Sequence, residues 1–143
     1  MTSLYHEAIL AEAKVAIGAG RLEAPDASLT IDNPLCGDRV TLDIALRDGQ
    51  IAGIGHEVKG CLLCQAAASL IARHADDRSA AHADDRLSSL KAYLRQGSDV
   101  DPETIWPGLS LFEPARAFKS RHRCVTLPFE ALAKALHHLE EQR

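Results

Sequence analysis

A run of alternating apolar and polar residues, followed by a tight turn and a second extended run, most constrains how this chain can fold. Between positions 40 and 47 every second residue is apolar, which is the period of a strand with one buried face. Asp48 and Gly49 then predict a hairpin turn, and Ile51–Lys59 is expected to return antiparallel. A sheet that buries one face needs a cover, which the rest of the chain has to provide.

Helical patterns on both sides of this hairpin predict the helices that cover the buried face of the sheet. Apolar residues at helical intervals predict an opening helix from Leu4 to about Ile17, and the alanine- and leucine-rich segment Cys61–Arg73 predicts a helix packed on the sheet. Leu29–Ile31 is expected to add a short strand. The fold class is therefore α+β, with a small antiparallel sheet of about three strands packed against several helices.

The second half of the chain predicts more helix, interrupted by one loop. A leucine-rich helix is expected to end at Gly97, and Asp99–Gly108, which contains the single tryptophan, Trp106, is expected to wrap the surface as a loop with a short helical turn. After the last cysteine, Thr126 is a candidate cap for a final helix with Pro128 in its first turn.

An eight-residue near-repeat lies between these parts. The segments 74–78 and 82–86 both read His-Ala-Asp-Asp-Arg. One interpretation is a solvated turn and helix start, with Ser79 as a possible cap. The other is a second metal site of histidine and aspartate.

The length and net charge of the chain exclude several classes of protein. The 143 residues are the size of one domain, spanning 1–143, and the net charge of −4 argues against a nucleic-acid partner because phosphate binding requires a basic face. The first ten residues lack the features of a secretory signal, and no apolar run is long enough for a membrane span. A cytoplasmic protein without a membrane is expected. Its four cysteines are then metal ligands, nucleophiles or core residues rather than disulfides.

Three of the cysteines and one aspartate form the candidate site. Cys36 and Asp38 stand two apart around Gly37, so both side chains can face one ion. Cys61 follows a glycine at the start of a predicted helix, where the helix dipole favours a thiolate, and Cys124 is expected to precede the last helix. Three thiolates and a carboxylate suit zinc or iron. The wide spacing differs from the compact pairs of a zinc finger, so spacing alone supports the site only in part.

On these residues the chain resembles the SufU branch of the IscU and NifU N-terminal-type iron–sulfur assembly proteins. The matching pieces are Leu4 and Tyr5, Asn33–Asp38, Gly60 and Cys61, Arg121, Cys124–Leu127, Ala131 and Leu132. The resemblance covers nearly the whole chain and implies the same IscU/SufU-like fold. It also implies a sulfur-transfer or scaffold protein rather than a stand-alone enzyme.

The resemblance further implies a role for each site residue. Cys36, Cys61 and Cys124 would bind Zn²⁺ or hold a transient iron–sulfur cluster, with Asp38 as the exchangeable ligand. Cys36 would accept persulfide sulfur from a SufS-like cysteine desulfurase, and downstream cluster-assembly proteins would be further partners. Arg121 occupies the basic position three before the last cysteine and would give electrostatic support.

Two features depart from the family pattern. Segment 12–22 lacks the histidine, proline, arginine and asparagine pattern that usually follows the first helix in the family, which puts docking to the usual partner in question. Cys64 stands where SufU-like chains commonly carry serine; it could be a buried core residue or a substitute ligand beside Cys61.

Two other functions remain open at this point. Cys61 and Cys64 could form the redox pair of a thiol oxidoreductase, although the alternating strand and helix pattern of thioredoxin-like proteins is absent. The chain could also be a zinc-stabilised interaction domain without chemistry of its own.

Overall fold

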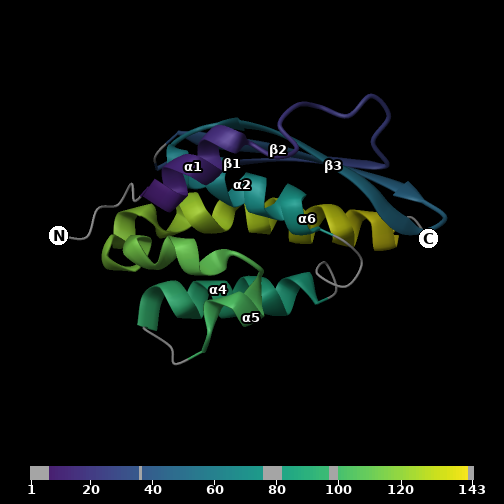
Figure 1. The fold of residues 1–143 in the computed structure, drawn as a ribbon. Helices are drawn as coiled ribbons and strands as arrows, with labels where there is room; N and C mark the ends of the chain where they lie inside the picture. Colours follow the sequence, from purple (N-terminus) through teal and green to yellow (C-terminus); the bar gives the residue numbers. More distant parts are fainter. Residues whose placement is uncertain (1–6, 36, 76–81, 97–99, 142–143) are drawn as a thin grey trace.

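The computed structural model contains a three-stranded antiparallel sheet with its helices gathered on one side (Figure 1). It describes residues 7–35, 37–75, 82–96 and 100–141. The sheet order is β1-β2-β3, formed by Ala27–Asn33, Asp38–Arg47 and Gln50–Lys59. The predicted α+β class with about three strands is therefore confirmed.

The central hairpin follows the alternation in the sequence. Val40, Leu42 and Ile44 on β2 are completely buried, as the period of two requires. Asp48 and Gly49 form the turn with φ of 55° and 80°, the left-handed region that a tight hairpin turn uses. The first strand is longer than the expected Leu29–Ile31, because β1 pairs with β2 over its full length.

Five α-helices and two 3₁₀ helices are described outside the sheet. Their bounds are α1 Glu7–Val15, α2 Leu62–His74, α4 Ala83–Gln96, α5 Pro102–Ile105, η1 Leu109–Ala117, η2 Lys119–Arg121 and α6 His122–Glu141. Helix α6 contacts β1 and β2 on one side and α4 on the other, so it forms the middle layer, and α1 packs on α2 (Figure 1). No helix in the described ranges is long and apolar enough to cross a membrane.

The ends of two helices differ from the prediction. Helix α1 spans Glu7–Val15, and the expected start at Leu4 lies outside the described residues. Helix α6 begins at His122, so Thr126 lies inside the helix and is not its cap. The Thr126 hydroxyl donates to the carbonyl of Arg123 at 3.5 Å, the backward bond of a residue already in a helix. Pro128 is consequently inside α6 rather than at its start.

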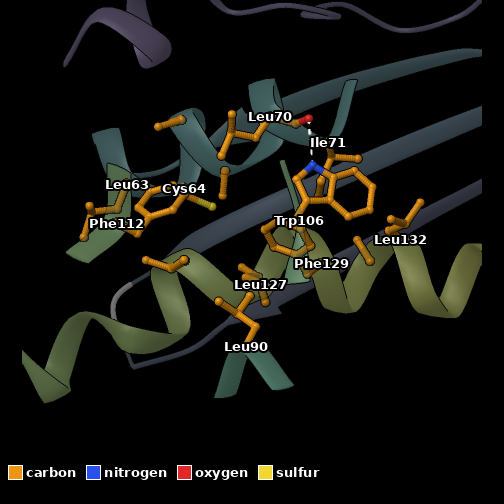
Figure 2. Close-up of a cluster of buried hydrophobic side chains, with 14 of the residues drawn as sticks. Leu63, Cys64, Leu70, Ile71, Leu90, Trp106, Phe112, Leu127, Phe129 and Leu132 are labelled. Atoms are coloured by element: carbon orange, nitrogen blue, oxygen red, sulfur yellow. Dashed lines mark hydrogen bonds between the residues drawn. The ribbon is translucent and has the colours of Figure 1, made fainter. Parts of the chain in front are cut away.

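The loop around Trp106 also differs from the prediction. It contains the expected short helix, α5, but Trp106 is only 1% exposed instead of lying in a surface wrap. Its indole nitrogen donates to the carbonyl of Leu70 at 3.0 Å, and its ring meets Phe129 edge-to-face at 5.4 Å between centroids (Figure 2). The tryptophan thus joins α5 to α2 and α6 in the core.

One buried carboxylate serves the fold rather than the site. The side chain of Asp43, on β2, is fully buried and accepts two bonds from the guanidinium of Arg21 and one from the backbone N–H of Leu22. Burial raises the pKa of Asp43, but the bonds from Arg21, Ser28 and Leu22 outweigh it and lower that pKa overall. These bonds fix the segment before β1 against the sheet.

Candidate metal centre

Three side chains from remote parts of the chain meet at one point. Asp38 begins β2, Cys61 directly precedes α2, and Cys124 lies in the first turn of α6. One oxygen and two sulfurs from these residues all lie within 4.8 Å of one another. The expected fourth member, Cys36, falls outside the described residues.

A turn between β1 and β2 places Asp38. The backbone N–H of Gly37 donates to the carbonyl of Asn33 at 2.8 Å, and the side-chain oxygen of Asn33 accepts from the N–H of Leu35. Gly37 has a φ of 74°, which glycine adopts without strain. Asp38 follows at the strand start, is 3% exposed, and accepts the backbone N–H of Cys61 at 3.2 Å. The aspartate therefore already touches the residue that carries the second ligand.

Gly60 makes the space that the Asp38 carboxylate occupies. A Cβ at Gly60 would lie 2.5 Å from the Asp38 Oδ1 atom and 2.8 Å from its Cγ. In the sequence Gly60 stood out only as the neighbour of Cys61, since a need for space at this position cannot be inferred from the residue type. The glycine is thus a positioning residue for the carboxylate.

Replacing Gly60 by alanine is expected to weaken zinc binding by about 10–100-fold, the usual cost of disturbing the support of a metal ligand. The new methyl group would push the Asp38 carboxylate away from the two sulfurs. Gly53→Ala is the matched control, because Gly53 lies on β3, the strand that Gly60 directly follows, with no atom within 4 Å of its added Cβ. Competition with a chromophoric chelator measures both affinities. Equal affinities for the two variants would contradict this role of Gly60.

The electrostatics of the site separate the two thiols. The hydrogen bond from Cys124 contributes most to lowering the pKa of Cys61, which falls to about 6. Backbone N–H groups of Cys64 and Leu63 lower this pKa further, whereas burial and the charge of Asp38 raise it. The same bond, burial and the Asp38 charge raise the pKa of Cys124. Without metal, Cys61 is therefore the thiolate and Cys124 keeps its proton.

This asymmetry predicts the pH dependence of alkylation in the metal-free protein. Because only the thiolate reacts and the pKa of Cys61 is lowered to about 6, its modification by iodoacetamide is expected to be half-maximal near that pH rather than near 9.0. Asp38→Asn should move the midpoint lower still, because the Asp38 charge raises this pKa. Peptide-resolved mass spectrometry after short pulses measures the rate at each cysteine. A Cys61 midpoint at an ordinary thiol pKa would be the contrary result.

The donor set fits a thiolate-binding metal. Tetrahedral zinc with sulfur at about 2.3 Å requires ligand atoms about 3.8 Å apart, which is within the observed limit. Zinc and iron both accept this mixture of sulfur and carboxylate donors. Burial of Asp38 and Cys124, with Cys61 half-buried, limits competition from water. A fourth ligand would complete the tetrahedral set.

The remaining predicted site residues lie elsewhere or are placed only in part. Cys64 is completely buried in the core beside Leu63 and Phe112, and it is not among the clustered ligand atoms (Figure 2). Arg121 is the half-buried last residue of η2, and its backbone N–H donates to Phe118. The ring of His122 bonds to the carbonyl of Arg116.

The near-repeat does not form a metal cluster in the part of the chain that can be described. Segment 76–81, with Ser79, lies outside it, while His74 ends α2 and residues 83–86 begin α4. His82 approaches Asp85 at 4.0 Å on the exposed surface. Among the described side chains, the group at Asp38, Cys61 and Cys124 is the one that meets the geometry of a metal site.

Comparisons with known proteins show which family this chain resembles. Residues 4–102 match the model of the NifU-like N-terminal domain. The chain is 25% identical over 138 residues to the zinc-dependent sulfurtransferase SufU of Bacillus subtilis, covering 95% of this chain and 91% of the relative. A nitrogen-fixing NifU-like protein (N-terminal) from Brucella abortus superposes with a TM-score of 0.82 and 33% identity, over 98% of this chain and 96% of the other.

A more distant structure shows the same fold. It is the candidate iron–sulfur cluster assembly scaffold protein for the SUF system from Fervidobacterium islandicum, with a TM-score of 0.79 and 23% identity, over 93% of this chain and 96% of that one.

Proposed function

The chain belongs to the family of NifU-like N-terminal domains, and we propose that it is an accessory protein of iron–sulfur cluster assembly. In this proposal it binds zinc or a nascent cluster and accepts sulfur from a cysteine desulfurase. The observation that carries the proposal is the meeting of Asp38, Cys61 and Cys124 from three remote segments. The similarity to a zinc-dependent sulfurtransferase supports the choice of zinc.

The proposed ligands are Cys36, Asp38, Cys61 and Cys124. Bound zinc would supply positive charge that keeps the thiols deprotonated and close together at neutral pH. The site has two of these features without metal, because the pKa of Cys61 is already lowered and the Asp38 carboxylate already accepts a hydrogen bond from the Cys61 N–H. One ligand is a carboxylate, which binds soft metals less tightly than a thiolate and suits a site whose occupant has to leave.

Cys36 is the proposed sulfur acceptor. Its thiolate would attack the outer sulfur of the persulfide on the desulfurase cysteine; a new S–S bond forms, the donor's S–S bond breaks, and the donor cysteine leaves as a thiolate. Its neighbour Leu35 is 93% exposed, which supports the approach of a partner protein to this part of the chain. Arg121 would add positive charge near the sulfur being transferred.

Anaerobic purification, metal analysis and a desulfurase assay with and without the protein test the proposal. The expected results are about one metal ion per chain and faster sulfide release by the desulfurase when the protein is present. Cys36→Ala should lose the stimulation, and Cys64→Ala should keep it. Metal-free protein together with full stimulation by Cys36→Ala would overturn the proposal.

The same preparation separates a sulfur relay from a scaffold. Added iron and sulfide should produce the visible absorption of an iron–sulfur cluster if the ligands act as a scaffold, and transfer to downstream assembly proteins can then be followed. A stable zinc form without cluster formation supports the relay. We further propose that residues 1–143 act as one domain in the reducing cytosol. One buried cluster with members from α1 to α6 supports the single domain, and the location follows the expectation from the sequence.

The structure favours this proposal over a thiol oxidoreductase. The Cys61 sulfur lies with Asp38 and Cys124 and shares a hydrogen bond with Cys124, whereas the Cys64 sulfur is not in this group and lies in the apolar core. An interaction domain without chemistry would unfold on chelation and leave the desulfurase rate unchanged, so the same assay distinguishes it.

A further inference from the structure

A concave site lies between α4, η2 and α6. It is a pocket of about 610 Å³, which is within the size range of small-molecule sites. Four exposed basic side chains line it: Lys91, Arg95, Lys119 and Arg123. Its inner wall includes the buried residues Leu94 and Thr126. We call it the α4/α6 pocket.

The charge of the α4/α6 pocket is opposite to that of the whole protein. Four positive side chains face one carboxylate, Glu130, in a chain whose net charge is −4. Glu130 is 16% exposed and pairs with Arg123 at 3.5 Å. In the described ranges, Lys91, Arg95 and Lys119 form no ion pair with a carboxylate. Three mutually repelling cations around one hollow indicate a site for negative charge.

The pocket is separate from the candidate metal centre. Thr126 and Glu130 stand four residues apart on α6 and so lie on one face of that helix. Cys124 precedes Thr126 by two residues, which places it about 200° around the helix axis. The thiol faces the sheet side of α6 and the pocket faces α4, so an anion in the pocket would not touch the metal ligands. The positive end of the α6 dipole lies near both.

We propose that the α4/α6 pocket binds a small organic anion with at least two negative charges, carried by phosphate or carboxylate groups. The guanidinium groups of Arg95 and Arg123 match the paired oxygens of either group, and the ammonium groups of Lys91 and Lys119 add charge without fixed geometry. Leu94, Thr126 and the aliphatic parts of the basic side chains provide a surface for the carbon skeleton. This site goes beyond the proposed sulfur transfer and does not depend on it.

Calorimetric titration of the metal-loaded protein tests the proposal. Fructose 1,6-bisphosphate and tricarballylate serve as phosphate and carboxylate probes, with neutral fructose for comparison. At low ionic strength at least one anion should bind with a dissociation constant below about 1 mM. That affinity should weaken several-fold at about 0.15 M salt, since screening acts on exposed charges. The stronger of the two probes identifies the preferred group. Absence of binding by both anions, or equal binding of fructose, would overturn the proposal.

Three variants locate the binding. Lys91→Glu combined with Arg95→Glu should weaken the affinity by more than about tenfold, because two attractive charges become repulsive. Glu130→Gln should strengthen it, because the one negative charge in the pocket is removed and Arg123 is released. Lys134→Glu is the control, as Lys134 is exposed on the same helix but does not line the pocket. Zinc content should be unchanged in all three. An equal loss with Lys134→Glu, or no change in the double variant, would place the anion elsewhere and refute the assignment.

Discussion

Replacing Cys124 by serine is expected to leave the purified protein without zinc, with an affinity more than about 100-fold below wild type. Disturbing a residue that only supports a ligand costs about 10–100-fold, so losing a ligand should cost more. A serine hydroxyl stays protonated at neutral pH and is a poor donor to a soft metal. The serine hydroxyl can still donate a hydrogen bond to Cys61 as Cys124 does, so the expected loss of affinity reports the missing sulfur ligand.

Cys64→Ala is the matched control for this variant. Both cysteines are completely buried, but the Cys64 sulfur is not among the clustered ligand atoms. Zinc content by elemental analysis and affinity by chelator competition should be unchanged in Cys64→Ala and lost in Cys124→Ser. A chelator should lower the melting temperature of wild type and of Cys64→Ala, and leave that of Cys124→Ser unchanged. If Cys124→Ser kept one tightly bound zinc while Cys64→Ala lost it, the ligand set proposed above would be wrong.

The hairpin and the helices of this protein were predictable because their signals are local. Alternation at 40–46 and the pair Asp48 and Gly49 contain the strand, its buried face and its turn within about ten residues. Helix α2 was expected at Cys61–Arg73 and spans Leu62–His74. In each case neighbours in the sequence decide the conformation, so little knowledge of the rest of the fold was required.

The start of α6 shows where local signals fail. Thr126 followed by Pro128 is a typical cap and first-turn proline, yet the helix begins earlier, at His122. The 3₁₀ turn η2 leads directly into it, and burial of the apolar face of α6 against the sheet and α4 stabilises the helix across the proline. As a result Cys124 lies within the first turn of α6, whereas the sequence placed it before the helix.

The ligands of the candidate site could be predicted better than the residues that hold these ligands in place. The resemblance and the residue types pointed to Cys36, Asp38, Cys61 and Cys124. The geometry brings the last three together, and Cys36 lies outside the described residues. The need for glycine at position 60 depends on where the Asp38 carboxylate packs across the sheet, a contact between residues 22 apart in the chain. Such contacts between distant segments have no local signature.

Trp106 is the clearest example of a residue whose long-range contacts could not be predicted from the sequence. Removing its side chain should have the largest effect on stability. The sequence predicted a surface loop around it, but the ring is buried between α2 and α6 (Figure 2). Trp106→Ala removes this ring and its bond to Leu70, and it is expected to lower the free energy of unfolding by about 3–5 kcal/mol. Urea denaturation followed by circular dichroism measures this, since the variant has no tryptophan fluorescence.

Two further variants show which contacts of Trp106 cause this loss of stability. Trp106→Phe keeps a ring that can pack on Phe129 but cannot donate to Leu70, so a smaller loss of about 1–2 kcal/mol is expected. Phe118→Ala removes an aromatic ring that is 37% exposed and should cost less than about 1 kcal/mol. Because Trp106 holds α5 against α2, and Cys61 directly precedes α2, the alanine variant should also bind zinc less tightly when partly unfolded by urea. A Trp106→Ala protein as stable as Phe118→Ala would mean that the indole contributes little to the core, in conflict with its burial.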